Sequence, residues 1–162
     1  MRLAPCSPED RPKLEAFLRD RGALRVARRS ELLRPLDHPA ILAWSAGRLV
    51  GAATYVIDAE QCELLTLHAQ SRFVGTGTSL LSAVKGAARE NGCTRLWVVT
   101  TNDNVDALRF YQRRGFRLSQ LRPGAVDASR RLSKPEIPEL GAHRIPLRDE
   151  LELEMSLVDA PT

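Results

Sequence analysis

The stretch Arg72-Phe73-Val74-Gly75-Thr76-Gly77 has an arginine and two glycines between an expected strand and an expected helix. A helix that begins after a glycine-rich turn presents unpaired N–H groups and a partial positive charge, and glycine lets a ligand approach the backbone closely. The pattern therefore predicts an anion site of the kind that holds a phosphate. The alternative, of about equal weight for a motif this short, is an ordinary turn that contains two glycines.

Two other phosphate-binding motifs fit this stretch less well. The sequence GTGTSL lacks the third glycine of GxGxxG, and no acidic residue follows at the distance that a dinucleotide site requires. The GK[ST] of a P-loop is also missing, so the stretch does not indicate a kinase or an ATPase.

A second group of side chains lies further along the chain. Asn104, Ala107 and Tyr111 are spaced three and four residues apart, so an amide, a small side chain and a phenol share one face of a helix. The small alanine leaves room for a ligand along this face. The alternative is that Asn104 caps the helix and that Tyr111 belongs to the core.

The elements that would position these groups follow from the hydrophobic periodicity. Helices are expected over residues 8–22, from Thr78 to the stop at Asn91-Gly92, and over 104–115. Strands are expected within 40–57, where a hairpin turns at Ala46-Gly47 and Gly51 marks a bulge, and over 61–69, 94–101, 116–121 and 150–157. Acidic and apolar residues alternate in 150–157, which predicts one wet face. The expected architecture is an α/β domain with a mixed sheet over residues 1–162, with a long loop at 122–149.

Taken together, the two motifs resemble the GNAT superfamily of acyl-CoA-dependent N-acetyltransferases. Its pattern [RQ]-x-x-G-x-[GA] matches Arg72–Gly77, and its N-x-x-A-x-x-x-Y with a following G-F matches Asn104–Tyr111 and Gly115-Phe116. The resemblance is close from Cys62 to Phe116 and points to a bacterial subgroup of unknown acceptor. It implies an α/β (α+β) fold with a mixed, mostly antiparallel central sheet of six to seven strands and helices on both faces. Phe73 departs from the family, which often has glycine there; it would narrow the site or shift the loop.

The resemblance implies acetyl-CoA as the acyl donor. Backbone groups of Leu65, Thr66 and Leu67 would pair with its pantetheine, and Asn104 would bind the pantetheine or the acceptor. The pyrophosphate would lie on the turn and the first helical residues, which are Arg72, Phe73, Val74, Gly75, Thr76, Gly77 and Thr78.

The implied reaction is direct attack of a primary amine, from a small molecule or a peptide, on the thioester. Tyr111 would be the general acid near the sulfur, and the N–H near Leu67 would polarise the carbonyl. Glu63 stands where many family members keep a carboxylate base, four residues before Leu67 and so on the same face of a regular strand. A solvated acid at the start of a strand is an equally weighted interpretation of Glu63. An acyl-enzyme on Cys62 is less favoured, because no histidine is placed by sequence to activate it.

The acceptor itself is not identified by the sequence. In the first part of the 122–149 segment, residues 122–134, the basic residues Arg122, Arg130, Arg131 and Lys134 are opposed only by Asp127. This favours an acidic acceptor and makes the segment a candidate lid. A solvated charged face is the more frequent reason for such a run.

Composition narrows the class of protein further. The chain has 162 residues, a net charge of +4 and 5% aromatic residues, and these aromatics do not interleave with the basic ones, so no nucleic-acid partner is expected. No long apolar run or signal peptide is seen, which predicts a cytoplasmic protein without a membrane partner. Three isolated cysteines are expected to be reduced, and no metal site is expected. The sequence does not decide between a monomer and a homodimer. The alternatives to an enzyme are a non-catalytic acyl-CoA-binding sensor and, less favoured, a basic nucleic-acid-binding domain.

Overall fold

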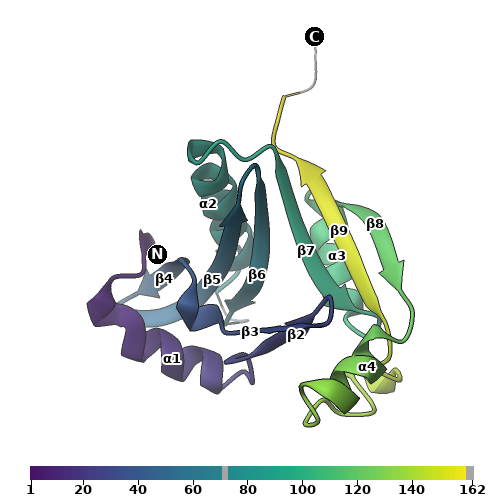
Figure 1. Cartoon of the computed structure of the whole chain (residues 1–162). Coiled ribbons are helices and arrows are strands. Elements are labelled where there is room, and N and C mark those ends of the chain that lie inside the picture. The colour runs from purple at the N-terminus through teal and green to yellow at the C-terminus, as the bar shows by residue number, and fades with distance from the viewer. Residues whose placement is uncertain (71–72, 160–162) are drawn as a thin grey trace. The chain divides into compact units, whose positions relative to one another are not determined.

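The computed structural model describes residues 1–70 and 73–159, which divide into two compact units (Figure 1). The first unit comprises Met1–Val26, Arg34–Leu96 and Leu157–Thr162, and the second comprises Ala27–Leu33 and Trp97–Ser156. A single domain over residues 1–162 therefore remains a prediction.

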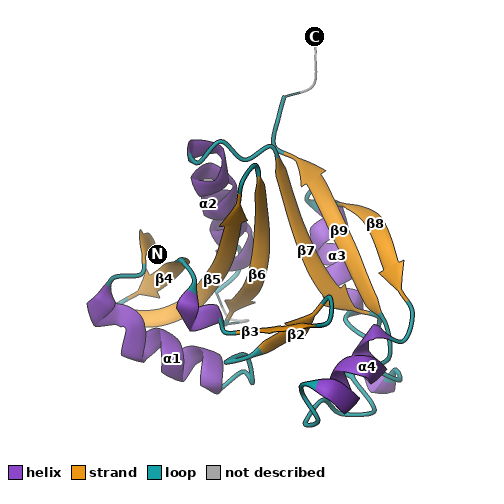
Figure 2. Cartoon of the chain, in the orientation of Figure 1, coloured by secondary structure: helices purple, strands orange, loops and turns teal. Residues whose placement is uncertain are grey.

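The first unit contains an antiparallel group of strands in the order β1-β4-β5-β6 (Figure 2). Its strands are β1 (Arg2–Pro5), β4 (Ala40–Ser45), β5 (Arg48–Asp58) and β6 (Gln61–Ala69). Its helices are α1 (Arg11–Arg19) and α2 (Thr76–Glu90), with short 3₁₀ turns η1 (Pro8–Asp10) and η2 (Pro35–Asp37). The expected elements in this part of the chain are all found, and α2 begins two residues before the expected Thr78.

Helices α1 and α2 cover opposite faces of this group of strands. Leu42 and Ala52 pack with Leu18 of α1 in one core cluster. Gly51, the neighbour of Ala52, faces α2, where a Cβ atom would lie only 2.7 Å from Cγ2 of Thr76. Because consecutive strand residues point to opposite faces, the two helices lie on the two sides of the sheet.

Two local features of the β4–β5 hairpin explain its glycines. The turn has left-handed backbone angles at Ala46 (φ 50°) and Gly47 (φ 76°), as the sequence predicts. The expected bulge lies at Val50, since Ala43 pairs with Gly51 and Trp44 pairs with Leu49. Gly51 itself is required because α2 approaches its backbone so closely.

The second unit contains strands in the order β7-β9-β8, with β8 and β9 antiparallel. Its strands are β7 (Arg95–Thr101), β8 (Arg117–Arg122) and β9 (Glu150–Ser156); the first two residues of β7 belong to the first unit. A separate two-stranded ribbon is formed by β2 (Val26–Arg28) and β3 (Glu31–Leu33). Its helices are α3 (Val105–Arg113) and α4 (Ala125–Leu132), with a 3₁₀ turn η3 (Ala142–Arg144). The 122–149 segment is therefore not a loop throughout, because α4 and η3 lie within it. Among the described residues, no helix has the length and apolar character needed to cross a membrane.

Candidate functional site

The turn between β6 and α2 is built mainly from backbone hydrogen bonds. The N–H of Phe73 donates to the carbonyl of Gln70 (3.0 Å), and the N–H of Thr76 donates to the carbonyl of Phe73 (3.3 Å). Gly75 has φ +87°, a left-handed angle that favours glycine, and its carbonyl accepts the first helical bond, from Ser79 (3.0 Å). Arg72, which the sequence places in the site, lies outside the described residues.

The outer surface of this turn is open. A Cβ atom on Gly75 would meet nothing within 4 Å, and Val74 is 96% exposed. Within the described residues, no backbone acceptor is found for the N–H of Gly77 in the first turn of α2. A helix of 15 residues thus directs its positive end and a free donor at open space, which is the arrangement that binds an anion.

Thr76 has a structural role in this turn. Its side chain is buried, with Oγ1 donating to Sδ of Met1 (3.2 Å) and Cγ2 facing Gly51. Its N–H is also used, by the carbonyl of Phe73. Thr76 therefore anchors α2 against the sheet, and the open part of the turn is formed by its neighbours.

Strand β6 contains a bulge that changes the expected direction of its side chains. Thr66 pairs with Thr54 and Leu64 pairs with Tyr55, so Leu65 is an extra residue. Glu63 is opposite Val56, whereas Leu67 is opposite Ala53.

Val56 and Ala53 are three residues apart in β5 and so point to opposite faces, as do their partners Glu63 and Leu67. The prediction that Glu63 and Leu67 share a face is therefore wrong, because it assumed a regular strand. Thr66 and His68, opposite Thr54 and Ala52, lie on the same face as Glu63.

The side chains next to this bulge are enclosed. Glu63 is 3% exposed, so the interpretation of a solvated acid is wrong. The hydroxyls of Thr66 and Thr54 lie 2.6 Å apart and share a hydrogen bond. Cys62 is fully buried, and burial, followed by the neighbouring Cys93 and Glu63, raises its pKa to about 12. The thiol is thus protonated at neutral pH, which argues against an acyl-enzyme on Cys62.

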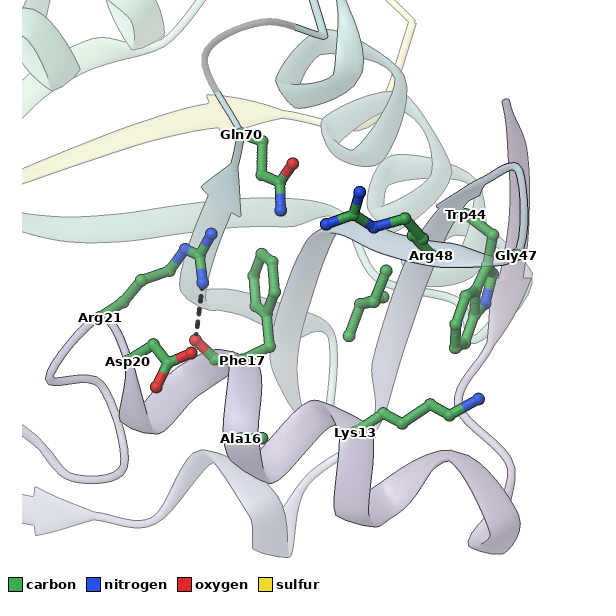
Figure 3. Close-up of a pocket in the computed structure, with 10 residues that line it drawn as sticks. Lys13, Ala16, Phe17, Asp20, Arg21, Trp44, Gly47, Arg48 and Gln70 are labelled. Carbon is green, nitrogen blue, oxygen red and sulfur yellow. Dashed lines mark hydrogen bonds between the residues drawn. The ribbon is translucent and has the colours of Figure 1, made fainter.

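A cleft that the sequence does not predict lies between α1 and the β4–β5 hairpin (Figure 3). Its volume is about 680 Å³. Basic, acidic and aromatic side chains line it, together with Gln70 at the start of the turn that leads to α2. Its residues come from three separate segments of the first unit, so a search for local motifs does not find it.

Asn104 and Tyr111 lie in the second unit, on α3. Oδ1 of Asn104 accepts a hydrogen bond from the N–H of Ala107 (3.1 Å), so Asn104 caps the helix. Tyr111 is 7% exposed, and its ring makes edge contacts with Phe110 and Phe116 at centroid distances of 5.3 and 5.2 Å. Burial raises the pKa of its phenol, which stays protonated and able to donate. Both residues thus have the structural roles that the sequence left as alternatives.

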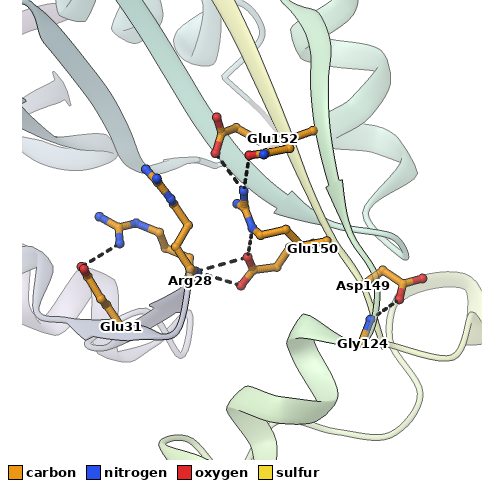
Figure 4. A network of polar contacts seen from close by, with 9 residues as sticks. Arg28, Glu31, Gly124, Asp149, Glu150 and Glu152 are labelled. Atoms are coloured by element: carbon orange, nitrogen blue, oxygen red, sulfur yellow. Dashed lines mark hydrogen bonds and ion pairs between the residues drawn. The ribbon is translucent and has the colours of Figure 1, made fainter.

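The acidic face of β9 is buried at Glu150 and Glu152, where the sequence predicts a wet face; Glu154 is half-buried and Ser156 is exposed (Figure 4). Glu150 and Glu152 are 2% and 6% exposed, and both form ion pairs with Arg122, at 3.0 and 3.1 Å. The Glu150 carboxylate also accepts a hydrogen bond from the N–H of Arg29 in the β2–β3 ribbon. Period-two patterning identified the strand, but the ribbon and Arg122 enclose the face that was expected to meet water.

Two arginines of the 122–149 segment, Arg122 and Arg130, are also bonded within the protein. Arg130 donates to the carbonyls of Ile137, Pro138 and Leu147 and pairs with Asp127 (2.8 Å). Nη2 of Arg122 has no hydrogen-bond partner among the described residues, but it is buried and so out of reach of a surface ligand.

The segment is fastened at its end as well, because the Asn102 side chain bonds to the backbone of Pro146, Arg148 and Asp149. These contacts argue against a lid and against an acidic-acceptor site built on Arg122 and Arg130.

Comparison with known proteins agrees with the fold and the motifs. The sequence profile of the acetyltransferase (GNAT) family matches residues 4–116. The uncharacterised protein YdhI of Bacillus subtilis is 43% identical over 106 residues, and the matched part spans 65% of this chain and 66% of the length of that curated relative.

Solved structures share the fold. An IAA acetyltransferase from Bacillus cereus has a TM-score of 0.72 and 21% identity, covering 96% of this chain and 98% of that one. A GNAT family acetyltransferase from Elizabethkingia anophelis with acetyl-CoA bound has a TM-score of 0.66 and 20% identity, covering 96% and 97%. The chain belongs to the GNAT acetyltransferase family, and the predicted fold class is confirmed.

Proposed function

We propose that this protein transfers an acetyl group from acetyl-CoA to a primary amine of a small molecule or a peptide. The observation that carries the proposal is the open turn at the N-terminus of α2, where Gly75 is left-handed and the N–H of Gly77 has no backbone acceptor among the described residues. Membership of the GNAT family supports it. The Elizabethkingia relative of the same fold binds acetyl-CoA.

The residues of the first unit fit the donor in two places. The turn and the first helical residues, from Arg72 to Thr78, would hold the pyrophosphate, because they combine a helix N-terminus with open space above Gly75. Backbone groups of Leu65, Thr66 and Leu67 would pair with the pantetheine, next to the bulge at Leu65. In the second unit, Asn104 and Tyr111 complete the proposed set; Asn104 is exposed and its amide N–H₂ remains a donor while its oxygen caps α3.

In the proposed reaction, the amine nitrogen bonds to the thioester carbonyl carbon while the C–S bond breaks. Glu63 accepts the proton that the nitrogen loses, directly or through a water molecule, and Tyr111 donates the proton that the departing sulfur gains. The N–H near Leu67 polarises the carbonyl oxygen. Burial of Glu63 excludes bulk water from the base, and burial of Tyr111 keeps the acid protonated.

A free-thiol assay with acetyl-CoA and a panel of amines, amino acids and aminoglycosides tests the proposal. We expect thiol release that depends on one class of amine, with the acetylated amine detected by mass spectrometry. Release without any amine dependence, or no release across the panel, contradicts it.

The second candidate is a non-catalytic acyl-CoA-binding module. One observation favours it: the helix cap and the ring contacts account for Asn104 and Tyr111 without any chemistry. This candidate predicts that acetyl-CoA binds and stabilises the protein while no amine releases thiol.

A further inference from the structure

The polar side chains of β6 form a row on the face covered by α1. Glu63, Thr66 and His68 share this face, because the bulge at Leu65 brings Glu63 into line with the other two. Gln70 continues the row two residues after His68; its N–H donates to the carbonyl of Val50 (2.9 Å), and its side chain lines the cleft in Figure 3. The row therefore leads from the proposed base directly into the cleft.

An electrostatic interaction between Arg21 and His68 also relates the row to the cleft. Arg21 lines the cleft, and its charge acts on His68, adding to the burial that lowers the pKa of this imidazole. The Arg21 guanidinium is held in place, 3.5 Å from the centroid of the Phe17 ring, with Nη1 donating to the Phe17 carbonyl (2.9 Å). Burial and the charge of Arg21 therefore both favour the neutral form of His68.

The charge of the cleft is mostly positive and mostly available. Lys13, Arg21 and Arg48 are opposed only by Asp20 among its lining residues. Lys13 and Arg48 are exposed and form no ion pair within the described residues. This is the reverse of the 122–149 segment, where Arg122 and Arg130 are used internally.

Two aromatic rings in the lining of the cleft lie against two of these cations. Nζ of Lys13 lies 5.2 Å from the centroid of the Trp44 ring, as Arg21 lies over Phe17. A ring beneath a cation limits the directions in which it is solvated and holds it at the cleft wall. An anion in the cleft therefore meets Lys13 on α1, Arg21 just after α1, and Arg48 on the β4–β5 hairpin (Figure 3).

We infer that this cleft binds an anionic group, a carboxylate or a phosphate, of the amine acceptor. The inference rests on the proposed function, and it adds the chemical class of the acceptor: an amine that carries an acid. Lys13 and Arg48 bind the anion as charged donors, and Arg21 positions it at the end of the polar row. The rest of the acceptor extends from the cleft toward Glu63, which lies seven residues before Gln70, about 20 Å away along an extended strand.

Binding of small probes tests the cleft without requiring catalysis. Phenylalanine and phosphoethanolamine carry the two anions, and phenylalaninamide and ethanolamine are the matched amines without them. In ¹⁵N-labelled protein, we expect the anionic probes to shift the indole N–H signal of Trp44, and the uncharged partners to bind at least tenfold more weakly. The indole signal of Trp97 in the second unit is the internal reference; Trp44→Phe assigns the two signals.

Charge reversal in the cleft gives the second arm. Arg48→Glu and Lys13→Glu should each weaken the anionic probe by about tenfold or more, while Arg34→Glu, an exposed cation of the same unit outside the cleft, should not. Acetyl-CoA affinity should be unchanged in all three variants. A larger effect on phenylalanine identifies a carboxylate, and a larger effect on phosphoethanolamine identifies a phosphate.

The outcomes separate this inference from the proposed function. Thiol release whose KM for every working acceptor is unchanged in Arg48→Glu, or probe binding that Arg48→Glu leaves intact, overturns the inference while acetyl transfer stands. Anion-dependent binding in the cleft without thiol release for any amine supports the anion site, but it overturns its role in an acceptor.

Discussion

Two regions of the molecule use their charged groups in opposite ways: the 122–149 segment of the second unit and the open turn and cleft of the first. In the second unit, Arg122 and Arg130 bond to buried carboxylates and to backbone carbonyls, and Asn104 caps a helix. In the first unit, the turn before α2 is open above Gly75, and Arg48 is exposed at the edge of a cleft. The sequence placed the acceptor charge in the second unit because arginines are dense there. The structure shows that an arginine is available to a ligand when its guanidinium has no partner within the protein, however many arginines lie nearby in sequence.

The largest expected effect concerns Tyr111, which is a packed residue of the second unit and the proposed acid. Tyr111→Phe keeps the ring contacts and removes the hydroxyl. If the phenol protonates the departing sulfur, turnover should fall by about 10²–10⁴-fold, with acetyl-CoA affinity nearly unchanged and little loss of stability. Steady-state kinetics and urea unfolding measure the two quantities. Turnover within a few-fold of the parent would leave Tyr111 with its packing role only.

The next effect concerns the ion pairs that Arg122 forms with the buried Glu150 and Glu152. Arg122→Ala removes the cation that pairs with the buried carboxylates of Glu150 and Glu152, which should cost about 3–5 kcal/mol of unfolding free energy. Arg131→Ala is the matched control, since Arg131 is exposed; its change should stay within about 0.5 kcal/mol. Equal effects of the two substitutions in urea unfolding would remove the distinction between engaged and open arginines.

A smaller effect is expected where α2 approaches the sheet. In Gly51→Ala, the new Cβ would lie 2.7 Å from Cγ2 of Thr76 and 3.2 Å from the carbonyl oxygen of His68. Such overpacking should destabilise the protein by about 1–3 kcal/mol and move the turn that α2 supports. Thermal unfolding gives the stability, and acetyl-CoA titration gives the effect on the turn. Gly86→Ala, where a Cβ meets nothing within 4 Å, should be tolerated.

The smallest effect is expected at Cys62. Its thiol is buried and its pKa is raised to about 12, so it takes no part in the proposed direct transfer. Cys62→Ala should leave turnover within a few-fold of the parent. Complete loss of turnover in a folded variant, or an acetylated Cys62 found by mass spectrometry after a short reaction, would restore the acyl-enzyme alternative.

Sequence alone predicted the features that depend on nearby residues. The β4–β5 turn, β6, α2 and α3 follow from periodicity and from glycines at fixed positions, and so does the strand–turn–helix of the proposed donor site. The bulge at Leu65 was not predicted, because it depends on pairing with β5. The burial of Glu150 depends on a ribbon more than 100 residues away in sequence, with Arg29 at a separation of 121. The cleft likewise combines three segments that no local pattern connects.

The measurement that tests the central claim most directly is a calorimetric titration of acetyl-CoA into the parent and into Gly75→Asp. The substitution places a negative charge in the open turn, and aspartate tolerates the left-handed angle of φ +87° better than most residues. Gly92→Asp is the matched control, because Gly92 has φ +76° and open space at the other end of the same helix. We predict that the parent and Gly92→Asp bind acetyl-CoA and that Gly75→Asp folds but does not bind. In thermal unfolding with acetyl-CoA at 100 times the dissociation constant, the parent and Gly92→Asp should each gain about 2.7 kcal/mol of stability. Equal affinity in Gly75→Asp and the parent would contradict the account.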